Sequence, residues 1–240
     1  MLPLVAAFFI VLAAAAAQAI TGFGYALVAI PLLTLVTEPR TAVVGAGLAG
    51  LWLSIGTLVN QRAHVTWPPA LALIGAAALG MPIGLVLLRV LSEVSLRLLI
   101  AGVALLFTAI VWRGARLPKH PVVVAGAGLV AGVLSTSTGT TGPPLVAAFQ
   151  AMGYEPRQFR ATIAAVFCFT GVLGVVGFTV TNQLTAPAQV IGLVTAPAVA
   201  LGWLAGNRVF ARIDPNRFRR IVLAALVASS AAAVLRALHS

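Results

Sequence analysis

The sequence predicts an all-α polytopic membrane protein built from two internal repeats, and three observations support this prediction. The 240 residues are 61% hydrophobic and only 8% charged, with a mean hydropathy of +1.09. A soluble domain of this size needs a charged exterior that this composition does not supply. Uncharged apolar runs of about 18 residues or more recur along the chain, and each is long enough to cross a bilayer as a helix. The third observation is that the chain repeats itself at about half its length.

The repeat is visible in short matched segments. Glu-Pro-Arg at 38–40 recurs at 155–157, and Thr-Gly at 21–22 recurs at 138–139, both with an offset of 117 residues. Farther along, Gly80 and Gly84 match Gly202 and Gly206 at an offset of 122 residues, and small residues with this spacing favour close helix packing. The repeat predicts one integral membrane domain with halves at 1–117 and 118–240, each a broken segment followed by three ordinary spans.

Charged residues, prolines and glycines divide the chain into eight apolar segments, which together predict eight to ten membrane helices. The first and fifth segments exceed 30 residues, which is too long for one straight span, and they are interrupted near 22–24 and 139–144. In hydrocarbon, the backbone groups of a broken helix must be satisfied by protein or by a wet cavity, so both breaks should face the interior. The eight segments are 3–36, 41–59, 67–89, 95–112, 120–152, 160–181, 187–208 and 217–237.

The way each broken segment crosses the membrane decides how the halves are related. If each turns back as a hairpin, each half crosses an odd number of times and the halves are inverted; if each crosses once, the halves are parallel. The hairpin arrangement places eleven of the 15 Lys and Arg on one side, against ten for the other arrangement. The positive-inside rule therefore favours inverted halves by a small margin, and both arrangements place both termini outside the cytoplasm.

The residues at the breaks suit an anion. A half-helix that begins inside the membrane presents unpaired N–H groups and a partial positive charge, so it can hold an anion without a buried Lys or Arg. Gly139 and Gly142 let a ligand approach the backbone, and the hydroxyls between Ser135 and Thr141 are donors for oxyanion oxygens. The alternative interpretation is a kink whose hydroxyls bond back to helix carbonyls, with Phe23 and Tyr25 acting in packing.

Arg160 lies just before the sixth segment, where it either guides anions or anchors the helix at the basic side. The candidate substrate-binding residues are Gln18, Thr21, Gly22, Gly24, Ser135, Ser137, Thr138, Gly139, Thr140, Thr141, Gly142 and Arg160.

Two motifs carry a resemblance to a known family. QAITGFGYAL at 18–27, followed by Pro31, resembles the first motif of the sulfite exporter TauE/SafE family, and GVLSTSTGTTGPP at 132–144 resembles its second. Many members have a run of glycines in the first motif, where this chain has Phe23 and Tyr25 around Gly24. The resemblance covers essentially the whole chain. It implies a permease for small anions in a bacterial inner membrane, typically for sulfur oxyanions and sulfonates and often for export.

We therefore expect a permease in the lipid bilayer that moves a small anion of the sulfite or sulfoacetate type by alternating access, with a homodimer as one candidate assembly. An anion channel of the same fold and a non-transporting membrane scaffold are the alternatives. The four Asp and Glu residues fall at segment ends, so a proton relay lacks a mid-membrane carboxylate. The sequence has no phosphate-binding loop, catalytic triad or metal-ligand cluster, so we expect no enzyme activity, cofactor or metal. The basic residues are spread between apolar segments, which indicates topology rather than binding to nucleic acid.

Overall fold

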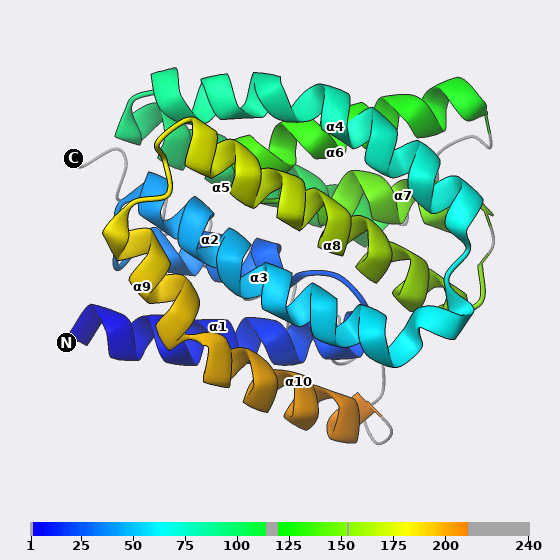
Figure 1. Ribbon diagram of the computed structural model, residues 1–240, viewed down its shortest axis with the longest axis horizontal. Helices are drawn as coiled ribbons and strands as arrows, with labels where there is room; N and C mark the ends of the chain where they lie inside the picture. The colour runs from blue at the N-terminus through cyan, green and yellow to red at the C-terminus, as the bar shows by residue number, and fades with distance from the viewer. Residues whose placement is uncertain (1, 114–119, 153, 211–240) are drawn as a thin grey trace.

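The computed structural model describes residues 2–113, 120–152 and 154–210, and every regular element in these ranges is helical (Figure 1). This confirms the predicted all-α class. The predicted segment 217–237 lies outside the described residues. The helices are α1 (Leu2–Thr21), α2 (Tyr25–Leu33), α3 (Pro39–Gln61), α4 (Trp67–Val90), α5 (Glu93–Arg113), α6 (Pro121–Ser137), α7 (Gly142–Met152), α8 (Pro156–Val180), α9 (Ala186–Val194) and α10 (Ala196–Phe210), with a short 3-10 helix at Arg62–His64.

Several of these helical stretches suit a bilayer. By length and composition, five stretches within the described residues are long and apolar enough to cross a membrane. Large apolar side chains such as Phe9, Leu79 and Val180 are exposed on the outside of the bundle, where lipid would cover them. The five stretches are Pro3–Thr21, Pro39–His64, Trp67–Val90, Arg157–Val180 and Ala186–Arg208.

Both long segments are broken where the sequence predicts, and each turns back on itself. The chain after α2 returns to the start of α1, because Val36 and Thr37 line one groove together with Pro3 and Leu4. In the second half, α7 returns along α6, and Leu145, Phe149 and Val124 belong to one apolar cluster. Figure 1 shows the first turn as the dark blue loop at the end of α1. Each broken segment therefore folds back on itself within the bundle.

Glycines bring two pairs of helices into backbone contact. An ideal Cβ placed on Gly80 of α4 would overlap the carbonyl oxygen of Leu129 in α6, and one on Gly132 of α6 would overlap that of Ala77 in α4. On α10, Gly202 faces the carbonyl oxygen of Leu12 in α1 in the same way. The predicted contact role of the repeat-matched glycines is confirmed, because a side chain at these positions would hold the helices apart.

The central pair, α3 and α8, runs antiparallel. The Phe178 ring, near the end of α8, lies by Gly47, near the start of α3. Leu51, farther along α3, lies by Gly171, earlier in α8. Figure 1 shows the two helices crossing the middle of the bundle in opposite directions. The bundle is thus organised around this pair, with α1 beside α10 and α4 beside α6 on its flanks.

The predicted segment 187–208 contains an interruption that the sequence analysis did not anticipate. Thr195 separates α9 from α10, although the stretch as a whole remains long enough to span a membrane. Pro197 has no N–H to donate to the carbonyl of Leu193, so the helical ladder is broken at that point. At the end of α9, the carbonyl of Ile191 accepts both from the Thr195 N–H at 3.1 Å and from the Thr195 hydroxyl at 2.6 Å.

We predict that Gly132→Ala lowers the melting temperature of the purified protein in detergent, because the new Cβ meets the α4 backbone. Overpacking of this kind costs about 1–3 kcal/mol. The matched control is Gly126→Ala on the same helix, where a Cβ has nothing within 4 Å. The control should keep or slightly raise the melting temperature, since alanine favours helix more than glycine does. Equal melting temperatures for the two variants would contradict the close packing of α4 on α6.

Candidate substrate cavity

The first break is a tight turn that requires glycine. Gly22 and Gly24 have φ angles of 82° and 107°, in the left-handed region that favours a residue without a side chain. The Gly22 N–H donates to the carbonyl of Gln18 at 2.7 Å. The Thr21 hydroxyl lies 2.9 Å from the Ala17 carbonyl oxygen, contacts that of Phe23, and accepts from the Phe23 N–H at 3.3 Å. Thr21 and Gly22 thus shape the turn that starts α2.

The second break is closed by hydroxyls that bond back to α6. Ser137 donates to the carbonyl of Val133 at 2.7 Å, and Thr138 lies 3.1 Å from that of Leu134. The hydroxyls of Thr138 and Thr140 are 2.6 Å apart and both side chains are fully buried. These bonds hold the segment from 138 to 141 in a compact turn, so that α7 begins inside the bundle.

Gly139 ties the second break to the first half of the chain. Its φ angle is 68°, and an ideal Cβ would overlap the side chain of Ile30 in α2 and lie 3.7 Å from that of Val43 in α3. At the start of α7, an ideal Cβ on Gly142 would lie 3.7 Å from the Cβ of Phe23. The two breaks therefore meet inside the bundle, as the sequence analysis expects of segments that cannot face lipid.

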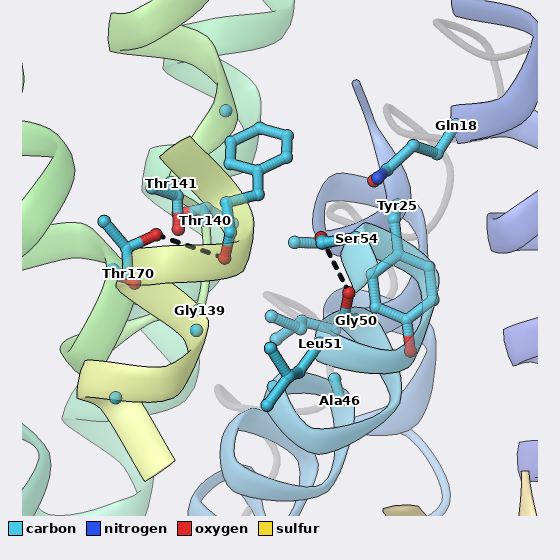
Figure 2. A pocket seen from close by; sticks show the side chains of 18 of the residues that line it. Gln18, Tyr25, Ala46, Gly50, Leu51, Ser54, Gly139, Thr140, Thr141 and Thr170 are labelled. Carbon is cyan, nitrogen blue, oxygen red and sulfur yellow. Dashed lines mark hydrogen bonds between the residues drawn. The ribbon is translucent and has the colours of Figure 1, made fainter. Parts of the chain in front are cut away.

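A cavity lies where the breaks meet, between α1, α2 and α3 on one side and α6, α7 and α8 on the other (Figure 2). In Figure 2, Gln18, Tyr25 and Ser54 lie on one wall, and Thr140, Thr141 and Thr170 lie on the opposite wall. The predicted site residues that line the cavity are Gln18, Gly24, Ser135, Gly139, Thr140, Thr141 and Gly142. Those that lie outside its lining are Thr21, Gly22, Ser137, Thr138 and Arg160.

The beginnings of two helices face this cavity. Gly24, Tyr25 and Leu27, from the start of α2, line it together with Thr141 and Gly142 from the start of α7. The first N–H groups of an α-helix have no acceptor within the helix and carry partial positive charge. No charged side chain is found among the described residues of the lining. The polar groups of the lining are therefore hydroxyls, the Gln18 amide and the backbone at helix ends, and the beginning of a helix is able to bind an anion.

Arg160 occupies a different place from the one expected of a substrate ligand. It lies in the second turn of α8, and its Cγ would be 2.9 Å from a Cβ on Gly22. Its Nη2 donates to the side-chain oxygen of Asn207 in α10 at 3.1 Å. Arg160 thus joins the first break to α8 and α10, and it contacts the back of the turn rather than the cavity.

Several lining residues were not predicted from the sequence. The sequence analysis gives packing as one alternative for Tyr25, and it does not consider Ser54 of α3 or Thr170 of α8, because they lie far from either break. Their hydroxyls bond to their own helices, Ser54 to Gly50 at 2.8 Å and Thr170 to Val166 at 2.8 Å. Glycines on α3 and α8 also line the cavity, at Gly47, Gly50, Gly171 and Gly174. Hydroxyls and glycines in the middle of uncharged spans were the available signal.

The chain matches a known family model and two named proteins over much of its length. Over residues 7–233 the chain matches the family model described as sulfite exporter TauE/SafE. It is 26% identical over 238 residues to a protein of Cupriavidus necator named probable sulfite/organosulfonate exporter TauE, covering 93% of this chain and 90% of that one. It is 29% identical over 165 residues to a Comamonas testosteroni protein named probable inner membrane transporter protein TsaS, covering 65% of this chain and 69% of that one.

No solved structure gives a significant match. The apolar helices and the transport proteins to which the chain is similar indicate a multi-pass membrane protein. Since the family model matches almost the entire length, the chain belongs to the sulfite exporter TauE/SafE family.

Proposed function

We propose that this protein is a permease that moves a small sulfur oxyanion or organosulfonate across a bacterial inner membrane by alternating access. The observation that carries the proposal is that α2 and α7 both begin at one uncharged cavity in the interior. The names of the two relatives, a sulfite/organosulfonate exporter and an inner membrane transporter, support the substrate class and the location.

In this proposal, the anion is held between the two helix beginnings. An oxyanion has several acceptor oxygens, so it can take N–H donors from α2 and α7 at the same time. The Thr141 hydroxyl is free to add a further donor, because it makes no hydrogen bond to another described residue and lines the cavity. Pro143 and Pro144 stand in the first turn of α7, where a missing N–H is tolerated.

We further propose that the halves 1–117 and 118–240 form an inverted repeat that supplies the two states of alternating access. The repeat equates α3 with α8, and these helices run antiparallel (Figure 1). It also equates α1 with α6, and α4 with the stretch of α9 and α10. Two equivalent pairs then pack by the same means, since glycines of α4 contact α6 and glycines of α10 contact α1.

Filling the cavity at Gly142 should stop transport without unfolding the protein. An ideal Cβ there lies 3.6 Å from the Phe167 ring and 3.7 Å from Phe23, so there is room for a first carbon. We expect Gly142→Val to lower uptake of labelled sulfite into proteoliposomes by roughly tenfold or more, which corresponds to about 1.4 kcal/mol. Gly142→Ala is the matched control with a smaller effect, and both should keep the melting temperature of the parent.

Uptake into the same proteoliposomes distinguishes a permease from a channel. A permease that alternates between two states should take up labelled anion faster when they are preloaded with unlabelled anion. Transport by Gly142→Val at the parental rate would contradict the site, and uptake that is indifferent to preloading would contradict alternating access.

Anion binding should depend on Thr141 more than on Thr138. A ligand at 100 times its dissociation constant stabilises the folded state by about 2.7 kcal/mol, so sulfite, sulfate, thiosulfate, sulfoacetate, chloride and acetate can be compared by thermal shift. A hydrogen bond to a charged group contributes about 1.5–3 kcal/mol, so Thr141→Val should weaken binding of the preferred anion about tenfold or more. The melting temperature without ligand should change little.

Thr138→Val serves as the comparison. It removes a fully buried hydroxyl that bonds to α6 and to Thr140, so it should lower the melting temperature in the absence of ligand. If no sulfur anion shifts the parent protein, or if Thr141→Val binds as the parent does, the proposed anion site is wrong.

We also propose that both termini lie outside the cytoplasm. This orientation predicts which loops are accessible from outside the cell. His64, after α3, and Thr185, before α9, are both exposed. In a variant with Cys168→Ala, we expect Thr185→Cys to react with a membrane-impermeant maleimide in intact spheroplasts. His64→Cys should react only after permeabilisation. The reverse pattern would overturn the orientation, and equal labelling of both loops in intact spheroplasts would contradict their placement on opposite sides.

A further inference from the structure

The described helices pack in two groups, and each group contains helices from both halves of the sequence. In the α1 group, α1, α2, α3, α5, α9 and α10 pack on one another, and in the α4 group, α4, α6, α7 and α8 do so. Figure 1 shows α4 beside α6 along the upper edge and α10 beside α1 along the lower edge. The third span of each half, which is α4 or the stretch of α9 and α10, therefore packs with the group of the other half.

Each group has an apolar core of its own. The core of the α1 group includes Val11, Val43 and Ile100, and the core of the α4 group includes Leu73 and Phe149. Among the described helices, extensive contact between the groups is made by α3 with α8, and the cavity lies along this seam. Two bodies with separate cores can move against each other without unpacking either core.

Arg40 joins the two groups at one end of the seam. It lies at the start of α3, where its Nε donates to the carbonyl of Leu88 at 3.0 Å and its Nη2 donates to those of Arg89 and Leu91 at 3.2 and 2.7 Å. The last carbonyls of α4 have no N–H partner within their helix, so Arg40 satisfies them from the other group. Leu88 and Phe178, from the last turns of α4 and α8, also pack into the core of the α1 group.

Arg160 makes the corresponding link at the opposite end of the seam, because α3 and α8 run antiparallel. It lies near the start of α8, and its Nη2 donates to the side-chain oxygen of Asn207 in the last turn of α10 at 3.1 Å. Beside it, Phe23 of the α1 group packs edge-on against Phe159 of the α4 group, with ring centroids 6.4 Å apart. Each link thus joins the start of a central helix to the end of the third span of the same half.

We propose that the α1 and α4 groups, rather than the two sequence halves, are the bodies that move in the transport cycle, and that Arg40 and Arg160 are positioning residues that hold opposite ends of the seam closed. This inference rests on the proposed permease and specifies how its two states differ. Release of the Arg160 link opens the cavity to the side of the membrane on which α8 begins, with the Arg40 end as the pivot. Release of the Arg40 link opens it to the other side.

Labelling of the cavity from each side of the membrane tests the two links. In a variant with Cys168→Ala, Ser54→Cys places a thiol on the cavity wall, and a membrane-impermeant methanethiosulfonate is added to inverted or right-side-out vesicles. We expect Arg160→Met to raise the labelling rate about fivefold or more in inverted vesicles, the effect of losing one hydrogen bond. Arg40→Met should raise it in right-side-out vesicles. General loosening of the structure would not produce effects on opposite sides.

Arg62→Met and Arg89→Met are the matched controls. Each removes an exposed Arg side chain, at the end of α3 and at the end of α4 respectively, and leaves both links in place. They should label at the rate of the variant with Ser54→Cys alone. Two link variants that act on the same side, or that label no faster than these controls, would overturn the proposal. Effects on opposite sides but in the exchanged vesicles would keep the links and overturn the proposed orientation.

A cross-link over the seam gives a second test that does not depend on either Arg. An ideal Cβ on Gly171 of α8 would lie 3.6 Å from the Cβ of Leu51 in α3, which is within the range of a disulfide. Since each opening pivots on a far end, these two positions should separate in both states. We expect oxidation of Leu51→Cys with Gly171→Cys, in the variant with Cys168→Ala, to stop exchange of labelled sulfite. Reduction should restore the exchange, and the oxidised form should still bind the anion in a thermal shift.

The control cross-link lies within the α1 group. It joins Gly45→Cys of α3 to Ile191→Cys of α9, where the two Cβ atoms would be 3.0 Å apart, and it should leave exchange running after oxidation. Equal exchange by the oxidised and reduced forms of the seam variant would overturn the moving groups and leave the permease standing. A parent that neither binds nor exchanges any sulfur anion would overturn the permease, while the labelling test, which needs no substrate, still decides on the links.

Discussion

The need to satisfy backbone groups at two interrupted helices governs this structure. In a bilayer, each N–H and C=O freed by a break must find a partner in protein or in a polar cavity. The chain meets part of this demand locally, since Thr21 and Thr138 place their hydroxyls on the turns themselves. The residues at the starts of α2 and α7 line one interior cavity. The same requirement that forces the breaks inward thus brings the starts of two helices to one cavity.

Close packing of the flanking helices makes this interior arrangement feasible. Because Gly80 and Gly132 let α4 and α6 touch through their backbones, and Gly202 does the same for α10 on α1, the flanking helices occupy little width. The hairpins formed by α2 and α7 can then lie within the bundle rather than against lipid. Glycines therefore serve two functions in this fold: Gly22, Gly24 and Gly139 allow left-handed turns, and those on α4, α6 and α10 allow contact between helices.

The sequence predicted the parts of the fold that depend on local signals. The length of the apolar runs predicted the spans, and glycines beside hydroxyl-bearing residues predicted the positions of both breaks to within a few residues. It could not separate lining hydroxyls from structural ones, because Ser137 and Thr141 are alike in the sequence and differ only in what lies beside them. Arg160 was included among the site candidates because of its charge. In the structure it packs against Gly22 of the first break and donates a hydrogen bond to Asn207. Ser54 and Thr170 were missed because only tertiary packing brings the middle of α3 and α8 to the cavity.

A cavity without charged side chains has a consequence for the proposed transport cycle. A buried Arg or Lys would hold an anion tightly. Its own charge would also stay buried in the membrane through each conformational change of the protein, which costs desolvation free energy. The beginning of a helix contributes only about 0.3–2 kcal/mol to the binding of an anion, and it leaves no formal charge in the cavity when the anion is absent. In the proposed mechanism, α2 and α7 therefore hold the anion weakly enough to release it.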